Sequence, residues 1–326
     1  MTCRLSVLVA AHNEAAFIAE ALQSAFVQDL SDFEIIVVDD GSDDDTARIV
    51  EGLFGEAPAG MRLRLLRSDG NHGLAHARNS ALSQARGEYV ALLDADDRLA
   101  SGALGRLLAR LERDRSTRLA FPLYRWMGRD GTPLPHSSPV PTGPIGARAI
   151  LLENPIHSDS GVTMRRGDLA AIGGFDDRLT GYVGADAWVR FALFHGENSL
   201  APEPEAVVHY RRHEAQITAN WRRMDRNWRV LVTKLDGEFA HSFAPIRAVA
   251  EARHDLFCSH LAYKAAEYRE ARRLLTRALR SNPAMLMKAE ARTRTLACIA
   301  SLLPERLHRG VRERFDPGDA RSGQAP

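Results

Sequence analysis

Three carboxylates stand within four positions at Asp94, Asp96 and Asp97, directly after the apolar run "YVALL". Like charges this close repel one another at a strand end unless solvent, a helix N-terminus or a cation neutralises them. Mn²⁺ and Mg²⁺ prefer oxygen ligands, and an Asp-x-Asp spacing lets one carboxylate bind directly and the other through water or a ribose hydroxyl. The spacing indicates a divalent-cation site, and the alternative is a solvated acidic loop.

A second acidic group, "VVDDGSDDDT", places Asp39 and Asp40 at the end of another apolar run, before Gly41. An ionised aspartate only accepts hydrogen bonds, so either carboxylate could bind the N3–H of a uracil or a ribose hydroxyl. The alternative is an Asp-rich turn that caps the helix "TARIV", and this alternative describes residues 43–45 best.

Alternating strand and helix patterns position both groups. Apolar runs predict strands over residues 4–10, 33–40, 62–68 and 88–97, and helical spacing fills the intervals between them. Repeated strand–helix–strand units predict an α/β fold with a mostly parallel sheet, whose ligands bind at the carboxyl ends of the strands. Those ends read "AHNE", "DDGSDDD", "SDGNHG" and "DADD". The chain has neither GxGxxG after the first strand nor GxxxxGK[ST], which argues against a dinucleotide dehydrogenase and a P-loop NTPase.

Composition fits a globular protein with room for one large domain and a smaller one, at 326 residues and 45% hydrophobic content. The three cysteines, Cys3, Cys258 and Cys298, have no disulfide or zinc spacing. No signal peptide and no apolar stretch of about 18 residues is found, so we expect a cytoplasmic protein.

Charge divides the chain unevenly. Residues 1–210 carry a net charge of −9 and residues 211–326 carry +10. The basic part could contact the anionic inner face of a membrane, dock on the acidic part, or be a solvated helical surface. We expect no nucleic-acid partner.

The organisation changes along the chain. Residues 130–160 are rich in Pro and Gly and predict a long irregular segment, and from about residue 215 only helical patterns remain. Within them, "AAEYREARRLLTRALRSNP" resembles one tetratricopeptide unit. We therefore predict a catalytic domain over residues 1–214, a helical extension over 215–315 and a disordered tail over 316–326.

Six ordered motifs resemble a known family. The stretch from "SVLVAAHNE" to "VVDDGSDDDT", followed by "NHGLAHARNSAL", "GEYVALLDADD", "IGGFDDRL", "GADAW" and "HYRRH", is similar to the family 2 glycosyltransferases. The resemblance covers roughly residues 4–215. It implies the GT-A fold, a three-layer sandwich with a mostly parallel central sheet, followed here by an all-helical C-terminal region.

The resemblance also implies roles for particular residues. His12 stands where the family usually has a tyrosine near the uracil. Asp40 matches the aspartate that accepts the uracil N3–H, and Arg78 matches an arginine of the nucleotide site. The nucleotide-sugar site implied in this way comprises Ala11, His12, Asn13, Glu14, Asp39, Asp40, Arg78, Asp94, Ala95 and Asp96.

The cation and the catalytic base are implied in the same way. Asp94 and Asp96 match the family's metal motif, and Asp97 could share that task. The late motif "HYRRH" suggests His213 as a further ligand, with His209 left open and Arg211 and Arg212 facing a leaving diphosphate. Asp186 matches the base that takes the acceptor proton, although Ala185 replaces the usual glutamate. The alternative is that Asp186 only caps the helix "AWVRFALF".

Together these matches imply an inverting, Mn²⁺- or Mg²⁺-dependent glycosyltransferase. It would move a sugar from a nucleotide-diphospho-sugar, first of all a UDP-sugar, to a saccharide or glycolipid acceptor in bacterial-type surface glycan assembly. Two rivals stay open: a nucleotidyltransferase of related fold, and a glycosyltransferase-like scaffold without activity.

Overall fold

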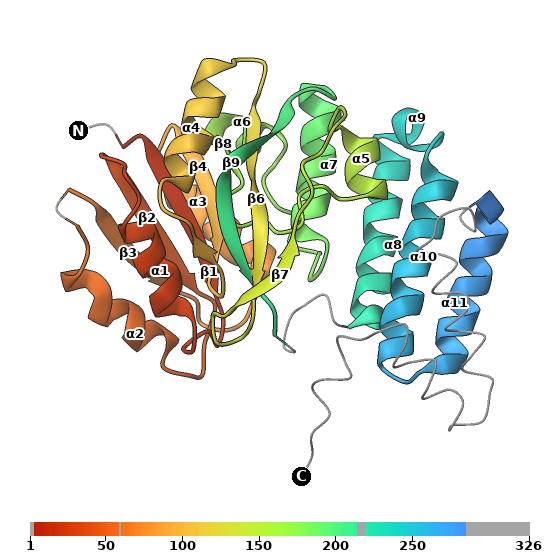
Figure 1. Ribbon diagram of the computed structural model, residues 1–326, viewed down its shortest axis with the longest axis horizontal. Helices are drawn as coiled ribbons and strands as arrows, with labels where there is room; N and C mark the ends of the chain where they lie inside the picture. The colour runs from red at the N-terminus through yellow and green to blue at the C-terminus, as the bar shows by residue number, and fades with distance from the viewer. Residues whose placement is uncertain (1–2, 59, 214–219, 285–326) are drawn as a thin grey trace, which may run out of the picture. The chain divides into compact units, whose positions relative to one another are not determined.

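A computed structural model describes residues 3–58, 60–213 and 220–284 (Figure 1). The chain divides into two compact units, residues 1–216 and 217–326. The predicted domain boundary at residues 214/215 and the predicted tail at 316–326 lie outside the described residues.

The first unit is built on one mixed sheet. Its strands are β1 (Leu5–Ala11), β2 (Phe33–Asp39), β3 (Arg62–Arg67), β4 (Tyr89–Asp94), β5 (Arg98–Leu99), β6 (Leu119–Met127), β7 (Pro133–Ser137), β8 (Thr163–Arg165) and β9 (Leu200–Arg211). The order is β3-β2-β1-β4-β8-β6-β9-β5, and β7 pairs with β6. The first four strands of this order are parallel, as predicted, whereas β8 runs antiparallel to both β4 and β6. The predicted α/β fold is confirmed.

Helices cover both faces of this sheet (Figure 1). Helices α1 (Ile18–Phe26), α2 (Thr46–Gly52) and α4 (Ala103–Arg113) pack on one face, where alternate residues of β1, β2 and β4 form a single buried core with them. Helix α3 (Leu74–Gln84) contacts β1 and β2 and contributes nothing to that core, so it covers the opposite face. Burying each large apolar side chain in such layers contributes about 1.5–3 kcal/mol, which fixes the position of the strand ends.

The remaining elements of this unit include two that the sequence did not predict. Residues 130–160, predicted to be irregular, contain β7 and helix α5 (Ala147–Leu152). The short helix η1 (Leu53–Gly55) follows α2, and helices α6 (Arg166–Ala171) and α7 (Val183–His195) precede β9.

Strand register brings the polar strand ends to one edge. Ala11 of β1 pairs with Asp39 of β2, and Ala10 pairs with Asp94 of β4. The predicted convergence of "AHNE", "DDGSDDD" and "DADD" therefore follows from the parallel register itself.

The second unit is helical in its described part. It contains α8 (Trp221–Glu238), α9 (Ala240–Phe243), α10 (Arg247–Lys264) and α11 (Tyr268–Ser281), and α10 packs against α11. None of the described helices in either unit combines the length and the apolar character that crossing a bilayer requires.

Candidate functional site

The end of β2 presents one carboxylate with an open acceptor position. Asp40 is 2% exposed, and its Oδ2 accepts hydrogen bonds from the backbone N–H groups of His72 (3.0 Å) and Gly73 (2.6 Å). Its Oδ1 is buried and has no hydrogen-bond partner among the described residues. A buried carboxylate oxygen without a donor is costly, so a ligand N–H would stabilise it.

Gly41 permits this arrangement. Its φ is +68°, and a Cβ at this position would lie 2.5 Å from the backbone carbonyl carbon of Gly70. The loop that carries His72 and Gly73 can therefore pass against the end of β2 only because residue 41 has no side chain.

The loop after β1 borders the backbone of Asp40. His12 Nδ1 lies 2.9 Å from the backbone carbonyl oxygen of Asp40. Asn13, at φ +59°, accepts from the backbone N–H of Asp43 through Oδ1 at 2.9 Å. The structure thus brings residues 11–14 and Asp40 together, whereas Asp39 Oδ1 accepts from the backbone N–H of Ser42 at 3.2 Å and serves the turn.

The motif "DADD" divides into three different environments. Asp96 Oδ2 lies 2.8 Å from His213 Nε2, and His213 Nδ1 is buried with no hydrogen-bond partner among the described residues. Two potential ligand atoms at this separation can coordinate one cation together, and a carboxylate with an imidazole suits Mn²⁺. Among the described residues, Asp96 and His213 are the predicted ligands that the structure places in contact.

Asp97 is occupied within the protein. Its Oδ2 accepts from the hydroxyls of Ser158 (3.1 Å) and Ser160 (2.6 Å), and its Oδ1 accepts from the backbone N–H of Arg211 (2.9 Å). Asp97 is also buried. Its carboxylate thus fixes a loop to the end of β4, and these contacts do not favour the suggestion that Asp97 shares the cation.

Arg78 is buried between two carboxylates. It donates from Nη2 to Asp94 Oδ1 at 2.7 Å and from Nη1 to Asp159 Oδ2 at 2.6 Å. Asp94 is thus held by a guanidinium, in contrast to Asp96. Asp159 was not predicted, because a single aspartate in "HSDSG" carries no recognisable spacing.

Two acids of this edge resist ionisation. Burial raises the pKa of Glu14 to about 7, with a further contribution from the negative charge of Asp96. Burial also raises the pKa of Asp94, against the opposing effect of Arg78. A cation would favour the ionised form of both groups.

Comparison with known proteins agrees with this geometry. Residues 6–173, just over half of the chain, match Glycosyl transferase family 2. The chain belongs to this family. The resemblance drawn from the six motifs is confirmed.

The curated relatives of this family 2 chain match it over part of their length. Chondroitin synthase from Escherichia coli is 28% identical over 211 residues, which is 60% of this chain and 29% of the synthase. The chain spans between 13% and 62% of the first curated relatives that it matches.

Two solved structures share the fold. The S. aureus TarS 1–349 complex with UDP-GlcNAc has a TM-score of 0.57 at 21% identity and covers 96% of this chain and 83% of that one. The mannosyltransferase PcManGT from Pyrobaculum calidifontis, in complex with GDP-Man and Mn²⁺, has a TM-score of 0.59 at 19% identity and covers 96% and 87%.

The structure does not favour the catalytic role implied for Asp186 by the family resemblance. Asp186 is 0% exposed, and its Oδ2 accepts from Nε and Nη2 of Arg190 at 2.9 and 2.6 Å. A carboxylate closed off from solvent and bound to an internal arginine is poorly placed to take a proton from an acceptor hydroxyl. This pair instead holds the loop before α7, because Arg190 also donates to the carbonyls of Ile172 and Gly174.

Arg211 is likewise structural. It is 2% exposed, and it donates to the backbone carbonyls of Asp96 (2.7 Å) and Arg129 (2.8 Å) and to the carboxylate of Glu20. It therefore does not face a leaving diphosphate. Arg212 is exposed and stacks over Trp126. His209 pairs in register with Arg98, so the choice between the two histidines favours His213.

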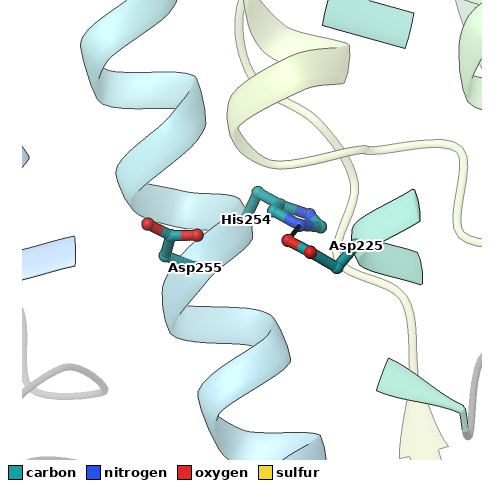
Figure 2. A group of neighbouring side chains, drawn as sticks. All are labelled: Asp225, His254 and Asp255. Carbon is teal, nitrogen blue, oxygen red and sulfur yellow. Dashed lines mark hydrogen bonds and ion pairs between the residues drawn. The ribbon is translucent and has the colours of Figure 1, made fainter. Parts of the chain in front are cut away.

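A second acidic cluster lies in the helical unit (Figure 2). Asp225, His254 and Asp255 have ligand atoms within 4.8 Å of one another. However, Arg277 donates to Asp255 Oδ2 at 2.6 Å, and Arg229 donates to Asp225 Oδ2 at 2.7 Å. Two arginines thus supply the positive charge that a cation would bring, and the cluster is explained as a structural ion-pair network.

Proposed function

We propose that this chain is an inverting, cation-dependent glycosyltransferase. It transfers a sugar from a nucleotide-diphospho-sugar, preferentially a UDP-sugar, to a saccharide or glycolipid acceptor in bacterial-type surface glycan assembly. The observation that carries the proposal is the unsatisfied Oδ1 of Asp40 at the same sheet edge as the Asp96–His213 pair. The first can accept a base N–H, and the second can hold a cation beside a diphosphate.

The chain's own groups account for donor binding. Asp40 Oδ1 accepts the N3–H of uracil, and the loop of His12 and Asn13 closes over the base. Asp96 and His213 hold the cation, whose charge would neutralise the diphosphate as it leaves. The TarS complex with UDP-GlcNAc supports a UDP-sugar as donor, and the chondroitin synthase supports a glycan product. The GDP-Man complex of PcManGT is the reason to test GDP-sugars as well.

A donor panel tests this function. We expect the full chain to release nucleoside diphosphate from one of UDP-, GDP- or dTDP-sugars by slow hydrolysis, and to do so only with Mn²⁺ or Mg²⁺ present. A luminescent assay of the released diphosphate, with EDTA as the matched control, measures this. Release from none of the sugars, or release unchanged by EDTA, would contradict the proposal, and the former result would favour a scaffold.

Asp40→Ala is expected to weaken UDP binding by about tenfold or more, because a hydrogen bond to a charged acceptor contributes about 1.5–3 kcal/mol. Isothermal titration with UDP measures the change. Asp43→Ala is the matched control, since Asp43 is exposed at the same turn and its backbone N–H is the group that contacts Asn13. Equal UDP affinity in Asp40→Ala and the wild type would exclude Asp40 from base recognition.

Cation binding should strengthen as pH rises from about 6 to 8. The pKa of Glu14 is raised to about 7 and that of Asp94 is raised as well, so both acids are protonated to a growing extent as pH falls through this range. A cation binds the ionised forms, and its apparent affinity must therefore fall with protonation. Mn²⁺ titration at fixed ionic strength measures this dependence, and Glu14→Gln should flatten it. A pH-independent affinity would contradict the assignment of these acids to the cation's surroundings.

A further inference from the structure

We propose that Asp159 is the general base that takes the proton of the attacking hydroxyl, in place of Asp186. This assignment rests on the proposed function and names a further residue of the same site. It starts from the finding that the carboxylate implied by the sequence pattern is sealed inside the protein. Asp159 is the carboxylate that stands nearby with part of its surface open, at 18% exposure of the side chain.

Asp159 occupies space that a side chain at the start of α7 would fill. A Cβ on Gly184 would lie 1.9 Å from Asp159 Oδ1 and 2.3 Å from Oδ2. Residue 184 therefore has to be glycine for the Asp159 carboxylate to stand where it does. A carboxylate therefore lies against the first turn of α7, and it belongs to Asp159 in the loop before β8.

That loop is fixed to the donor side of the site. The hydroxyls of Ser158 and Ser160, on either side of Asp159, both donate to Asp97. Ser160 Oγ also accepts from the backbone N–H of Asp94 at 3.0 Å, and the N–H of Gly161 donates to Leu92 at 2.7 Å. Asp159 is consequently held at a set distance from the end of β4, as a base needs to be relative to the donor sugar.

The hydrogen bonds of Asp159 orient it and leave acceptor capacity. Oδ1 accepts from Trp188 Nε1 at 2.9 Å, and Oδ2 accepts from Arg78 Nη1 at 2.6 Å. Each carboxylate oxygen has a second acceptor position. Arg78 is shared with Asp94, so the three groups together carry one net negative charge, which a proton from the acceptor would neutralise.

The step balances as a single displacement. The acceptor oxygen forms a bond to the anomeric carbon while its proton passes to a carboxylate oxygen of Asp159. The bond from the anomeric carbon to the phosphate oxygen breaks, and its electron pair leaves with the nucleoside diphosphate. In the absence of a sugar acceptor, water is the attacking hydroxyl.

Asp159→Asn tests the assignment in the full chain, with the nucleotide sugar that gives the fastest hydrolysis in the donor panel and with Mn²⁺. We expect kcat to fall about 100-fold or more, the usual range for loss of a general base, while the Kd of the nucleotide sugar changes less than about threefold. Asp168→Asn is the matched control. Asp168 also pairs with an arginine, Arg118, at 2.9 Å. It lies in α6, whose first residue, Arg166, donates its backbone N–H to the carbonyl of Glu88 just before β4 begins, at the end of β4 opposite to Asp94.

Two rescue experiments separate a base from a structural group. Sodium formate should raise the kcat of Asp159→Gly by at least about tenfold. The double variant Asp159→Gly/Gly184→Asp should regain kcat without formate, because the Cβ of the new aspartate lies where the Asp159 carboxylate stood. A purely structural role predicts no effect of formate.

Several results would overturn the assignment. These are wild-type kcat in Asp159→Asn, loss of nucleotide-sugar binding together with kcat, or failure of formate to restore Asp159→Gly. Loss of kcat in folded Asp186→Asn with normal turnover in Asp159→Asn would return the role to Asp186. A wild type that hydrolyses none of the sugars would refute the proposed function itself. An active wild type with an equally active Asp159→Asn would refute only the role of Asp159.

Discussion

Arg190→Met is expected to lower the free energy of unfolding by about 3–5 kcal/mol, because it removes the guanidinium that neutralises the buried carboxylate of Asp186. Arg190 donates twice to Asp186, and it also satisfies the carbonyls of Ile172 (2.5 Å) and Gly174 (2.8 Å). The variant therefore removes the cationic donor of a buried carboxylate and the side-chain donor of two backbone carbonyls. Urea unfolding measures the change, which should fall on the transition of the first of the two compact units.

A second substitution distinguishes charge burial from simple loss of packing. Asp186→Leu in the Arg190→Met background should recover part of the lost stability, since a buried ion pair replaced by apolar groups is often tolerated. Arg48→Met is the control, because Arg48 pairs with Asp45 at the surface and should leave the unfolding curve nearly unchanged. An Arg190→Met variant as stable as the control would show that Asp186 is solvated or paired elsewhere.

The sequence predicted for a physical reason which strand ends meet at one edge of the sheet. Runs such as "RLSVLVA" and "FEIIVVDD" are apolar and β-branched, so they specify buried parallel strands, and parallel register alone brings Ala11, Asp39 and Asp94 to one edge. The acids at that edge could therefore be grouped before the fold was known.

The position of Asp159 could not be predicted from local sequence patterns. Asp159 and Gly184 are 25 positions apart, and only the folded chain shows that one carboxylate needs the other residue to lack a side chain. Asp186 matched a motif position, yet Arg190 four residues later offered a competing i,i+4 partner that the motif does not weigh. Asp97 differs from Asp96 only in what it faces, and spacing alone does not decide that.

In the helical unit, residue types alone would suggest a site that the surrounding charges argue against. Asp225, His254 and Asp255 have types that bind metals, and their proximity could suggest a cation site. Their neighbours Arg229 and Arg277 change that interpretation, because each carboxylate already has a cationic donor. Charge balance around a cluster is therefore as informative as the identity of its members.

Asp96→Asn is expected to remove tight Mn²⁺ binding and to lower turnover by about 100-fold or more. Asparagine keeps the size of the side chain but not the charge, and Asp96 contributes one of the two donor atoms that stand 2.8 Å apart at the proposed cation site. Loss of a charge-stabilising group at the leaving diphosphate has effects of this order. The EPR signal of free Mn²⁺ measures binding, and nucleoside diphosphate release measures turnover.

The matched control compares the two acidic clusters directly. Wild type should bind one Mn²⁺ per chain, Asp96→Asn should bind none in the same range, and Asp225→Asn should still bind one. Asp225 lies 3.4 Å from His254 Nε2 and so copies the Asp–His chemistry of Asp96 and His213, but Arg229 already neutralises it. Mn²⁺ binding that survives Asp96→Asn and disappears in Asp225→Asn would move the cation to the helical unit. The sheet edge would then bind the diphosphate by other means, because Asp96 would have no cation to offset its charge.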